Sequence, residues 1–349
     1  MSALVDAGYR RFEVGFGALR IRLRARSVTV GIALAAAVIA LAVVSLGLGS
    51  YALDPAQVLT AFAGGGTDLD RTVVLEWRLP RTLAAVALGA LLAVSGALFQ
   101  TVTRNPLASP DILGLSNGAF AGMLLTLTLV SSSWPALTIG AVVGGVSVAL
   151  VIGALARRGG VQGFRLIVIG IGISAMLASL NTWMLLQVEL ETAMFASAWG
   201  AGSLNGITAA PLGGALVCAV PLLIGAAVLV PRLRQLDLGD DVAAATGARP
   251  ALVRGGALLL GVGLVSIATA VVGPIAFVAL AAPQIARRLA RTPYLSLTLA
   301  GLVGALLLLT SDVIAQHLLP VVLPAGVITV TLGGIYLVIT IIQEIRRRA

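Results

Sequence analysis

The chain has 349 residues, of which 59% are hydrophobic and 11% charged, and its formal net charge is +9. This composition excludes a soluble globular protein, because the polar residues are too few to cover so apolar a chain. It also excludes a β-barrel, since the apolar stretches are long and unbroken, as from Val28 to Leu48, instead of short and alternating.

Ten apolar stretches follow one another along the chain, each close to the length of about 20 residues that a helix needs to cross a bilayer. They run over residues 29–50, 82–103, 112–131, 135–156, 165–188, 211–231, 251–272, 274–290, 296–315 and 323–343. We therefore predict an all-α polytopic membrane protein with about ten transmembrane helices. The helices are expected to form one domain, residues 29–345, behind a basic N-terminal segment, residues 1–28.

Basic residues are distributed unevenly between these stretches. All but three of the 23 basic residues lie in the two terminal segments or in every second gap, and the exceptions, Arg71, Arg78 and Arg81, share one gap. Loops rich in arginine stay in the cytoplasm, so the pattern predicts an even number of spans with both termini cytoplasmic. The positive net charge is therefore a topology signal, and we expect no nucleic-acid partner.

The chain contains no lysine, one cysteine (Cys218) and one histidine (His317). A Walker A phosphate loop needs a lysine that reaches the β- and γ-phosphates, so ATP hydrolysis by that route is excluded for this chain. A disulfide framework and a Cys/His metal cluster are excluded as well. We expect no catalytic site and no bound cofactor or metal.

Glycine and proline indicate how the helices pack. Glycines recur at four-residue spacing in the third and fourth spans, at Gly114, Gly118, Gly122, Gly140 and Gly144. This spacing lets helix backbones touch, so we expect these glycines to serve packing and not to line a substrate pathway. In the eighth span, the Gly273-Pro274 pair and the internal Pro283 predict a short, kinked helix.

The gap between the sixth and seventh spans predicts a short surface helix at about residues 238–248. It reads Leu238-Gly-Asp-Asp-Val-Ala-Ala-Ala-Thr-Gly247, with acids at the N-terminus that complement the helix dipole and a glycine stop. Composition alone leaves two explanations open, a capped surface helix and a segment that docks into a partner subunit. The predicted topology places this helix in the cytoplasm, where ATP is.

A series of longer motifs occurs in a fixed order over about residues 50–345. It comprises Arg78-Leu-Pro-Arg81, Ser95-Gly-Ala-Leu-Phe-Gln100, Arg104-Asn-Pro-Leu-Ala-Ser-Pro-Asp111, Phe164-Arg-Leu-Ile-Val-Ile-Gly-Ile-Gly172, Ala201-Gly-Ser-Leu-Asn-Gly206, Gly239-Asp-Asp241, Gly273-Pro-Ile-Ala-Phe277 and Leu323-Pro-Ala-Gly-Val327. Together they resemble the FecCD family, the permease subunits of bacterial iron-siderophore and cobalamin ABC importers. Within the family the chain is similar to the second permease subunit of ferric enterobactin importers, on Glu76-Trp-Arg78, Asn181-Thr-Trp183, Leu190-Glu-Thr192 and Leu332-Gly-Gly-Ile-Tyr336.

The resemblance implies a type II ABC importer permease in the bacterial cytoplasmic membrane, with ten helices per subunit. Its cargo would be a ferric siderophore, catecholate and enterobactin-like, moved by alternating access. Its partners would be a second, different permease subunit, two ATPase subunits that hold ATP-Mg, and an extracytoplasmic siderophore-binding protein. Coupling to the ATPase is assigned by resemblance to Leu238, Gly239, Asp240, Asp241, Val242, Ala245 and Gly247.

The resemblance also assigns docking of the binding protein to Arg78 and Arg81. The residues themselves favour this role, because they are two of the three basic residues on the predicted outer face and the arginine fork suits carboxylates. The alternative is that they anchor the second helix at the headgroup level. Glu189 and Glu191 are expected at the outer mouth, where they either meet the binding protein or only solvate a loop.

The chain departs from the family pattern at two positions. Gln284 stands where many relatives have a histidine, and Gln316 where some have a third docking arginine, so docking on this subunit is expected to be weaker or asymmetric. Asp312, near the outer end of the ninth span, needs a partner or water, because a carboxylate in the membrane costs about 2.5–3.5 kcal/mol. Solvation at the helix end is its simplest explanation, and a role in proton coupling is the alternative.

Rival functions make different demands on the sequence. An import permease for cobalamin or haem would share the same motifs, because the binding protein supplies most of the selectivity. An ion-coupled secondary transporter would need ionisable residues near the middle of several spans, which contain almost none. A channel would need a selectivity filter or a charged ring, and neither is visible.

Overall fold

The structure, a computed structural model, describes residues 11–16, 19–111, 113–156 and 163–348. Its ten longer helices are α1 (Ala25–Gly47), α4 (Leu79–Thr103), α5 (Leu115–Leu129), α6 (Trp134–Ala156), α7 (Gly163–Leu185), α9 (Ala209–Asp237), α11 (Pro250–Val272), α12 (Val278–Ala290), α13 (Leu297–Val313) and α14 (Ala325–Arg348). The shorter helices are α2 (Pro55–Phe62), α3 (Asp68–Arg71), α8 (Leu190–Gly200), α10 (Asp240–Ala245) and two π-helical segments, η1 (Thr72–Arg78) and η2 (Ile314–Leu318).

Each predicted span overlaps one of the ten longer helices, which confirms the prediction of a helical polytopic membrane protein. Among the described residues, seven continuous helical segments are long and apolar enough to cross a bilayer, by length and composition. The helices α5 and α12 are shorter, with 15 and 13 residues, and the described apolar part of α14 covers Ala325–Thr340.

The central element of the bundle is α4, which packs against α9, α11, α12 and α13. The helix α4 belongs to the continuous helical segment Asp68–Thr103, and 78% of the most hydrophobic stretch of that segment is buried. Two glycines on α4 permit close approach, because a Cβ atom on Gly89 would collide with the backbone of Gly304, and one on Gly96 with the backbone of Ala279. At these two glycines the backbones of α13 and α12 therefore come into van der Waals contact with the backbone of α4.

The helices α5 and α6 form a second close pair. A Cβ atom on Gly122 would strike the backbone of Gly140, and one on Gly144 the backbone of Gly118. The predicted packing role of these four glycines is therefore confirmed. Gly114 has a different role, because it precedes α5 with a φ of 81° and packs against Ser174 of α7.

The predicted eighth span is short, as expected, but its helix begins only at Val278 and not at residue 274. The reason lies in two backbone conformations, since Gly273 has a φ of 74° and Phe277 is left-handed with a φ of 68°. The non-helical segment between them packs against the segment after α8, where the Ser203 N–H donates to the Val272 carbonyl at 2.8 Å.

One feature of the N-terminal segment was not predicted. Strands β1 (Arg11–Phe16) and β2 (Leu19–Arg24) pair antiparallel ahead of α1, with Arg11 opposite Arg24. The segment Leu19–Arg24 alternates apolar and basic residues, a period of two that favours a strand. The all-helical expectation overlooked this alternation.

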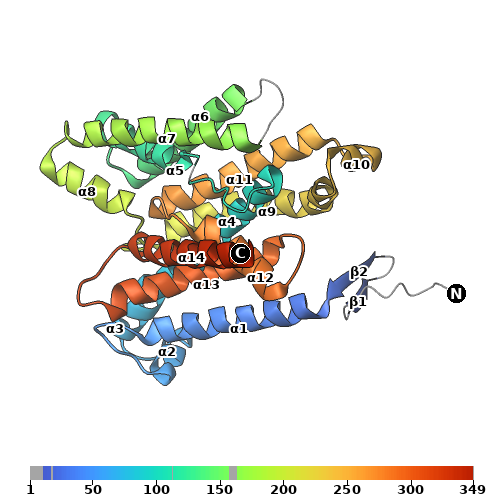
Figure 1. Cartoon of the computed structure of the whole chain (residues 1–349). Helices are drawn as coiled ribbons and strands as arrows, with labels where there is room; N and C mark the ends of the chain where they lie inside the picture. Colours follow the sequence, from blue (N-terminus) through green and yellow to red (C-terminus); the bar gives the residue numbers. More distant parts are fainter. Residues whose placement is uncertain (1–10, 17–18, 112, 157–162, 349) are drawn as a thin grey trace.

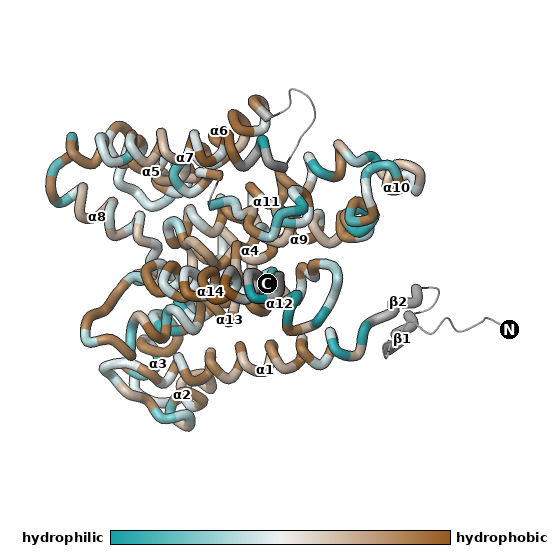
Figure 2. Tube along the Cα trace, viewed as in Figure 1, coloured by the Kyte–Doolittle hydropathy of each residue, from teal (hydrophilic) through white to brown (hydrophobic). Residues whose placement is uncertain are grey.

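The helices run roughly side by side, so the molecule has two ends (Figure 1). One end carries α2, α3 and α8 and is called the α8 end here. The opposite end carries α10 and the two strands and is called the α10 end. Hydrophilic residues gather mainly towards the two ends, and the lengths of the helices between them are largely hydrophobic (Figure 2). This distribution is the one expected of a bundle that crosses a bilayer.

Candidate functional site

At the α8 end, Arg81 and Asp312 form a bidentate ion pair between α4 and α13. Arg81 Nε donates to Asp312 Oδ2 at 2.8 Å, and Nη2 donates to Oδ1 at 2.6 Å. The side chains are 21% and 7% exposed, so little water competes for them. Two parallel charge-assisted hydrogen bonds fix both position and orientation. Asp312 thus has a protein partner, and helix-end solvation is not needed to explain it.

The same guanidinium group also reaches the segment that follows α8. Arg81 Nη1 donates to Asn205 Oδ1 at 2.6 Å, and Gln316 Nε2 donates to the same oxygen at 3.2 Å. Gln316, weighed above only as a missing arginine, therefore helps to hold Asn205. The network connects α4, α13 and the segment 201–208.

Arg78 lies one turn earlier, at the end of the π-helical segment η1. Its Nη1 donates to the Leu46 carbonyl at 2.8 Å and its Nη2 to the Tyr51 carbonyl at 2.5 Å. A π-helical turn contains an extra residue, which changes the direction of the following side chains. Arg78 and Arg81 are both held by hydrogen bonds within the chain. Both also line a cavity of about 610 Å³ at this end, which is called the rim cavity here.

A second cavity, of about 680 Å³, lies beside the rim cavity and is called the aromatic cavity. It is lined by Trp134, Phe195 and Trp199, by polar Ser203, Asn205 and Thr208, and by several aliphatic residues. Gly206, Ile207, Thr208 and Val322 line both cavities and so form a common wall. The Arg81 network holds the segment that carries most of this wall.

Glu189 and Glu191 lie at the start of α8, where both are exposed. Their position at a helix N-terminus suits a negative charge. They share α8 with Phe195 and Trp199 of the aromatic cavity. The structure therefore brings all four predicted docking residues to the α8 end, with the arginines and the glutamates on different elements.

At the α10 end, Asp240 is held between two arginines from other helices. Arg254 Nη2 donates to Asp240 Oδ1 at 2.6 Å, and Arg104 Nη2 donates to it at 2.9 Å. Arg104 also donates to the Leu236 carbonyl at 2.6 Å. Desolvation would raise the pKa of Asp240, but Arg254 and Arg104 outweigh it and hold this pKa below its ordinary value. The carboxylate connects α10 to the ends of α4 and α11.

The rest of α10 faces outward. Leu238 and Val242 are 68% and 46% exposed, and Asp241, Ala245 and Gly247 are exposed too. Ala243 is fully buried beneath them. Gly239 and Gly247 bound the helix with φ values of 109° and 86°, a conformation that favours glycine. The two neighbouring acids therefore differ, because Asp240 is partly exposed and paired with Arg104 and Arg254, whereas Asp241 lies on the exposed side of α10.

A polar cavity of about 300 Å³ opens beside this cluster, lined among others by Gln100, Arg104, Asp237, Gln284 and Tyr294. Gln284 Nε2 donates to Gln100 Oε1 at 2.6 Å, and Gln100 Nε2 donates to the Leu280 carbonyl at 2.9 Å. Gln284 thus joins α12 to α4 in a neutral hydrogen-bonded pair.

Asp111 was quoted in a motif above, but no role was predicted for it. It is partly buried in the connection between α4 and α5, and its carboxylate accepts hydrogen bonds from Ser116 Oγ at 2.9 Å and from Ser109 Oγ at 3.2 Å. Desolvation raises the pKa of Asp111 to about 6, against the lowering effect of these bonds. A carboxylate that follows Pro110 and precedes an apolar run was the available signal.

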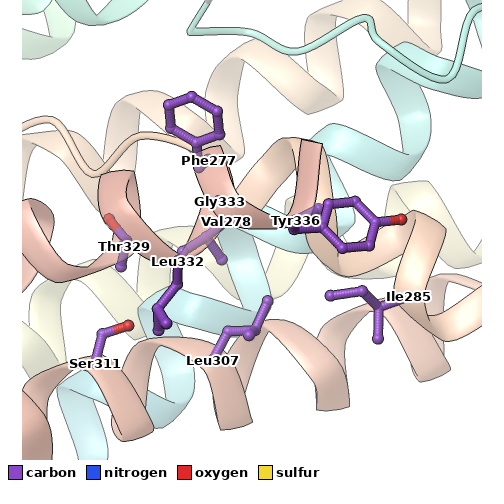
Figure 3. Close-up of a pocket in the computed structure, with 10 residues that line it drawn as sticks. Phe277, Val278, Ile285, Leu307, Ser311, Thr329, Leu332, Gly333 and Tyr336 are labelled. Carbon is purple, nitrogen blue, oxygen red and sulfur yellow. The ribbon is translucent and has the colours of Figure 1, made fainter. Parts of the chain in front are cut away.

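A small cavity between α12, α13 and α14 is lined by Phe277, Ser311, Tyr336 and other residues (Figure 3). Its volume of about 30 Å³ is suitable for water but too small for a substrate. Ser311 Oγ and Tyr336 OH are buried and have no hydrogen-bond partner among the described residues.

Comparison with known proteins agrees with this geometry. The model of the FecCD transport family matches residues 36–343. The ferric enterobactin transport system permease protein FepG of Escherichia coli (strain K12) is 48% identical over 301 residues, which cover 86% of this chain and 91% of that protein. FepD, described as a permease of the same system in the same organism, is 35% identical over 308 residues, 86% of this chain and 90% of that protein.

More distant relatives carry other cargo names. The hemin transport system permease protein HmuU of Yersinia pestis is 34% identical over 283 residues, which cover 79% of this chain and 84% of that protein. Among solved structures, a metal-chelate type ABC transporter in an inward-facing conformation matches with a TM-score of 0.78 at 26% identity, over 90% of this chain and 99% of that one. The sequence motifs, the helical arrangement and these matches agree, and the chain belongs to the FecCD transport family.

Proposed function

We propose that this chain is a permease subunit of an ABC importer that carries a ferric siderophore of the catecholate class across the bacterial cytoplasmic membrane. The observation that carries the proposal is the 48% identity to a ferric enterobactin permease over 86% of the chain. The hemin permease, at 34% identity, supports haem less well as the cargo. Cobalamin import rests on the family resemblance alone.

In the proposed topology the α10 end faces the cytoplasm and the α8 end faces outward. The arginines support this orientation, because those at positions 104, 232, 234, 249, 254, 287, 288 and 291 belong to the gaps at the α10 end. Arg71, Arg78 and Arg81 belong to the opposite end. Both chain termini would then lie in the cytoplasm.

The exposed side of α10 is proposed to dock into a cleft of an ATPase subunit, which binds ATP-Mg and hydrolyses it. Leu238 and Val242 supply apolar contact, and Asp241 a charge. Asp240 holds α10 on Arg104 and Arg254, so a displacement of α10 would move the ends of α4 and α11 with it. Since α4 is the centre of the bundle, this link is suited to drive alternating access.

The substrate-binding protein is proposed to dock at the α8 end through Arg78, Arg81, Glu189 and Glu191. Arg81 already bonds Asp312 and Asn205, so an incoming carboxylate has to replace one of them. Replacement at Nη1 would release Asn205 and with it the wall between the two outer cavities. Docking and opening of that wall would thereby be connected.

The second permease subunit is proposed to be a related but different chain. Two different relatives of this chain, FepG and FepD, are both named permease proteins of the ferric enterobactin transport system in one organism. That naming supports a heterodimer over a homodimer.

The test is affinity purification of the tagged chain from its native membrane, followed by reconstitution of the complex in liposomes with its binding protein. We expect a second permease and a Walker-motif ATPase to copurify, and ATP-dependent uptake of ⁵⁵Fe-enterobactin. Uptake of haem or cobalamin but not of ferric enterobactin would overturn the cargo. A transport-competent preparation without any ATPase would overturn the ABC assignment.

A further inference from the structure

The aromatic cavity is lined by three aromatic residues, a residue type that is scarce in this chain. Aromatic residues make up 5% of the chain, yet Trp134, Phe195 and Trp199 line this one cavity. They come from two elements, since Trp134 begins α6 and the other two lie one turn apart on α8. A cavity of about 680 Å³ lies within the range of about 300–1,000 Å³ that is usual for small-molecule sites.

The rings differ in how firmly they are held. Trp199 is 9% exposed and stacks on Phe120 of α5, with ring centroids 6.0 Å apart and an interplanar angle of 11°. Phe195 is 48% exposed. Trp199 is therefore fixed by packing, whereas about half of Phe195 is exposed and its ring is free to contact a ligand in the cavity.

Polar groups border the aromatic surface. Ser203, Asn205 and Thr208 line the same cavity, and the Ser203 hydroxyl accepts the Asn205 N–H at 3.1 Å. Arg81 contacts Asn205 from the adjoining rim cavity. A ligand in the aromatic cavity would thus meet aromatic rings together with hydroxyl and amide groups.

We infer that the aromatic cavity binds the aryl rings of the ferric chelate as it leaves the binding protein; the inference rests on the proposed function. A catecholate chelate offers flat aryl rings, amide and phenolate oxygens, and a net negative charge. The rings would stack on Trp199 and Phe195, and the oxygens would meet Ser203, Asn205 and Thr208. Because Asn205 belongs to both the cavity and the Arg81 network, ligand entry and docking would act on one segment.

The experiment measures uptake of ⁵⁵Fe-enterobactin by the reconstituted complex with its binding protein. Phe195→Leu and Trp199→Leu are each expected to lower the initial rate about tenfold, because a lost ring stack is worth about one factor of ten. Trp199→Phe keeps a ring and is expected to retain most of the rate. Trp183→Leu is the matched control, since Trp183 lies on α7, is 58% exposed and does not line the cavity.

The outcomes separate this inference from the proposed function. If the wild-type complex carries no ferric enterobactin, the proposed function fails, and this inference with it. If the wild type does and both leucine variants match Trp183→Leu, only the aryl site is overturned. Phe195→Leu guards against misfolding, because its side chain is half exposed and its removal leaves the Phe120–Trp199 stack in place.

Discussion

At the scale of single residues, the Arg81–Asp312 pair is the feature that sequence reasoning assigned only in part. Arg81 was predicted to face a partner protein and Asp312 to be solvated, but the two side chains are 231 positions apart and bind each other. A pairing over such a separation depends on how α4 packs against α13 and leaves no local pattern in the sequence. The sequence therefore singled out both residues by their type and position, but it did not predict that they bind each other.

Replacing Asp312 with asparagine is expected to lower the free energy of unfolding by about 2–5 kcal/mol, because a largely buried guanidinium group loses its charged partner. The double variant Arg81→Gln/Asp312→Asn should lose less than the two single variants together. Thermal unfolding of the purified complex measures this. Arg71→Gln is the control, because its partner Asp68 is 95% exposed and the pair is worth little. Strictly additive losses would contradict the pairing.

Asp111 predicts a dependence of stability on pH. Its pKa is raised from 3.8 to about 6 in the folded state, so between about pH 4 and 6 the folded state binds more protons than the unfolded state. Stability is therefore expected to fall as pH rises through this window, by about 3 kcal/mol in all, and to level off above it. Asp111→Asn should remove this slope. The measurement is the thermal unfolding midpoint of the wild type and of Asp111→Asn at pH 4, 5, 6 and 7.5. An equal dependence on pH in both proteins would refute the role of Asp111.

At the scale of elements, glycine and proline predicted which helices pack closely and which helix is short, but not the residue at which α12 begins. The α5–α6 glycines and the shortened α12 were both expected. The π-helical turn η1 and the left-handed Phe277 were not, because tertiary contacts impose such conformations on residues with no preference for them. The same holds for the different orientations of Asp240 and Asp241.

The close contact of α5 and α6 allows a matched pair of substitutions on one helix. Gly144→Ala is expected to destabilise the protein by about 1–3 kcal/mol, since the added Cβ meets the backbone of Gly118. Gly153→Ala, also on α6, has nothing within 4 Å of the added atom and should be neutral or slightly stabilising. Thermal midpoints of the two variants provide the comparison. A Gly144→Ala variant as stable as Gly153→Ala would show that the helices are further apart.

The link between α10 and the bundle can be tested by contrasting its two acids. Asp240→Asn is expected to lower uptake about tenfold while the ATPase still copurifies, because α10 keeps its outer face but loses its charged connection to α4 and α11. Asp241→Arg alters only the exposed side and should instead reduce the amount of ATPase recovered. Uptake per ATP hydrolysed and the recovered ATPase are the two readouts. Swapped phenotypes would mean that Asp241, and not Asp240, holds α10.

At the scale of the whole molecule, the apolar stretches were sufficient to predict the ten longer helices of the described residues, because their length reflects the bilayer and not the details of packing. The cavities were beyond prediction. The aromatic cavity is formed by residues 134, 195, 199 and 324, among others, which come together only once α6, α8 and the segment before α14 are placed.

The orientation of the molecule in the membrane is a further property of the whole molecule, and it is predicted from the distribution of arginines between the two ends of the bundle. In a Cys218→Ala background, which removes the only native cysteine, Ala63→Cys near α2 and Arg249→Cys before α11 report on opposite ends of the bundle, and both positions are exposed. A membrane-impermeant maleimide applied to intact spheroplasts is expected to label position 63, and position 249 only after permeabilisation. The reverse pattern would place α10 outside, away from any ATPase, and would remove the coupling role together with the topology. Labelling of both positions only after permeabilisation would leave neither end on the outer face. The basic gaps can hold the α10 end in the cytoplasm only if position 249 is protected in the intact membrane.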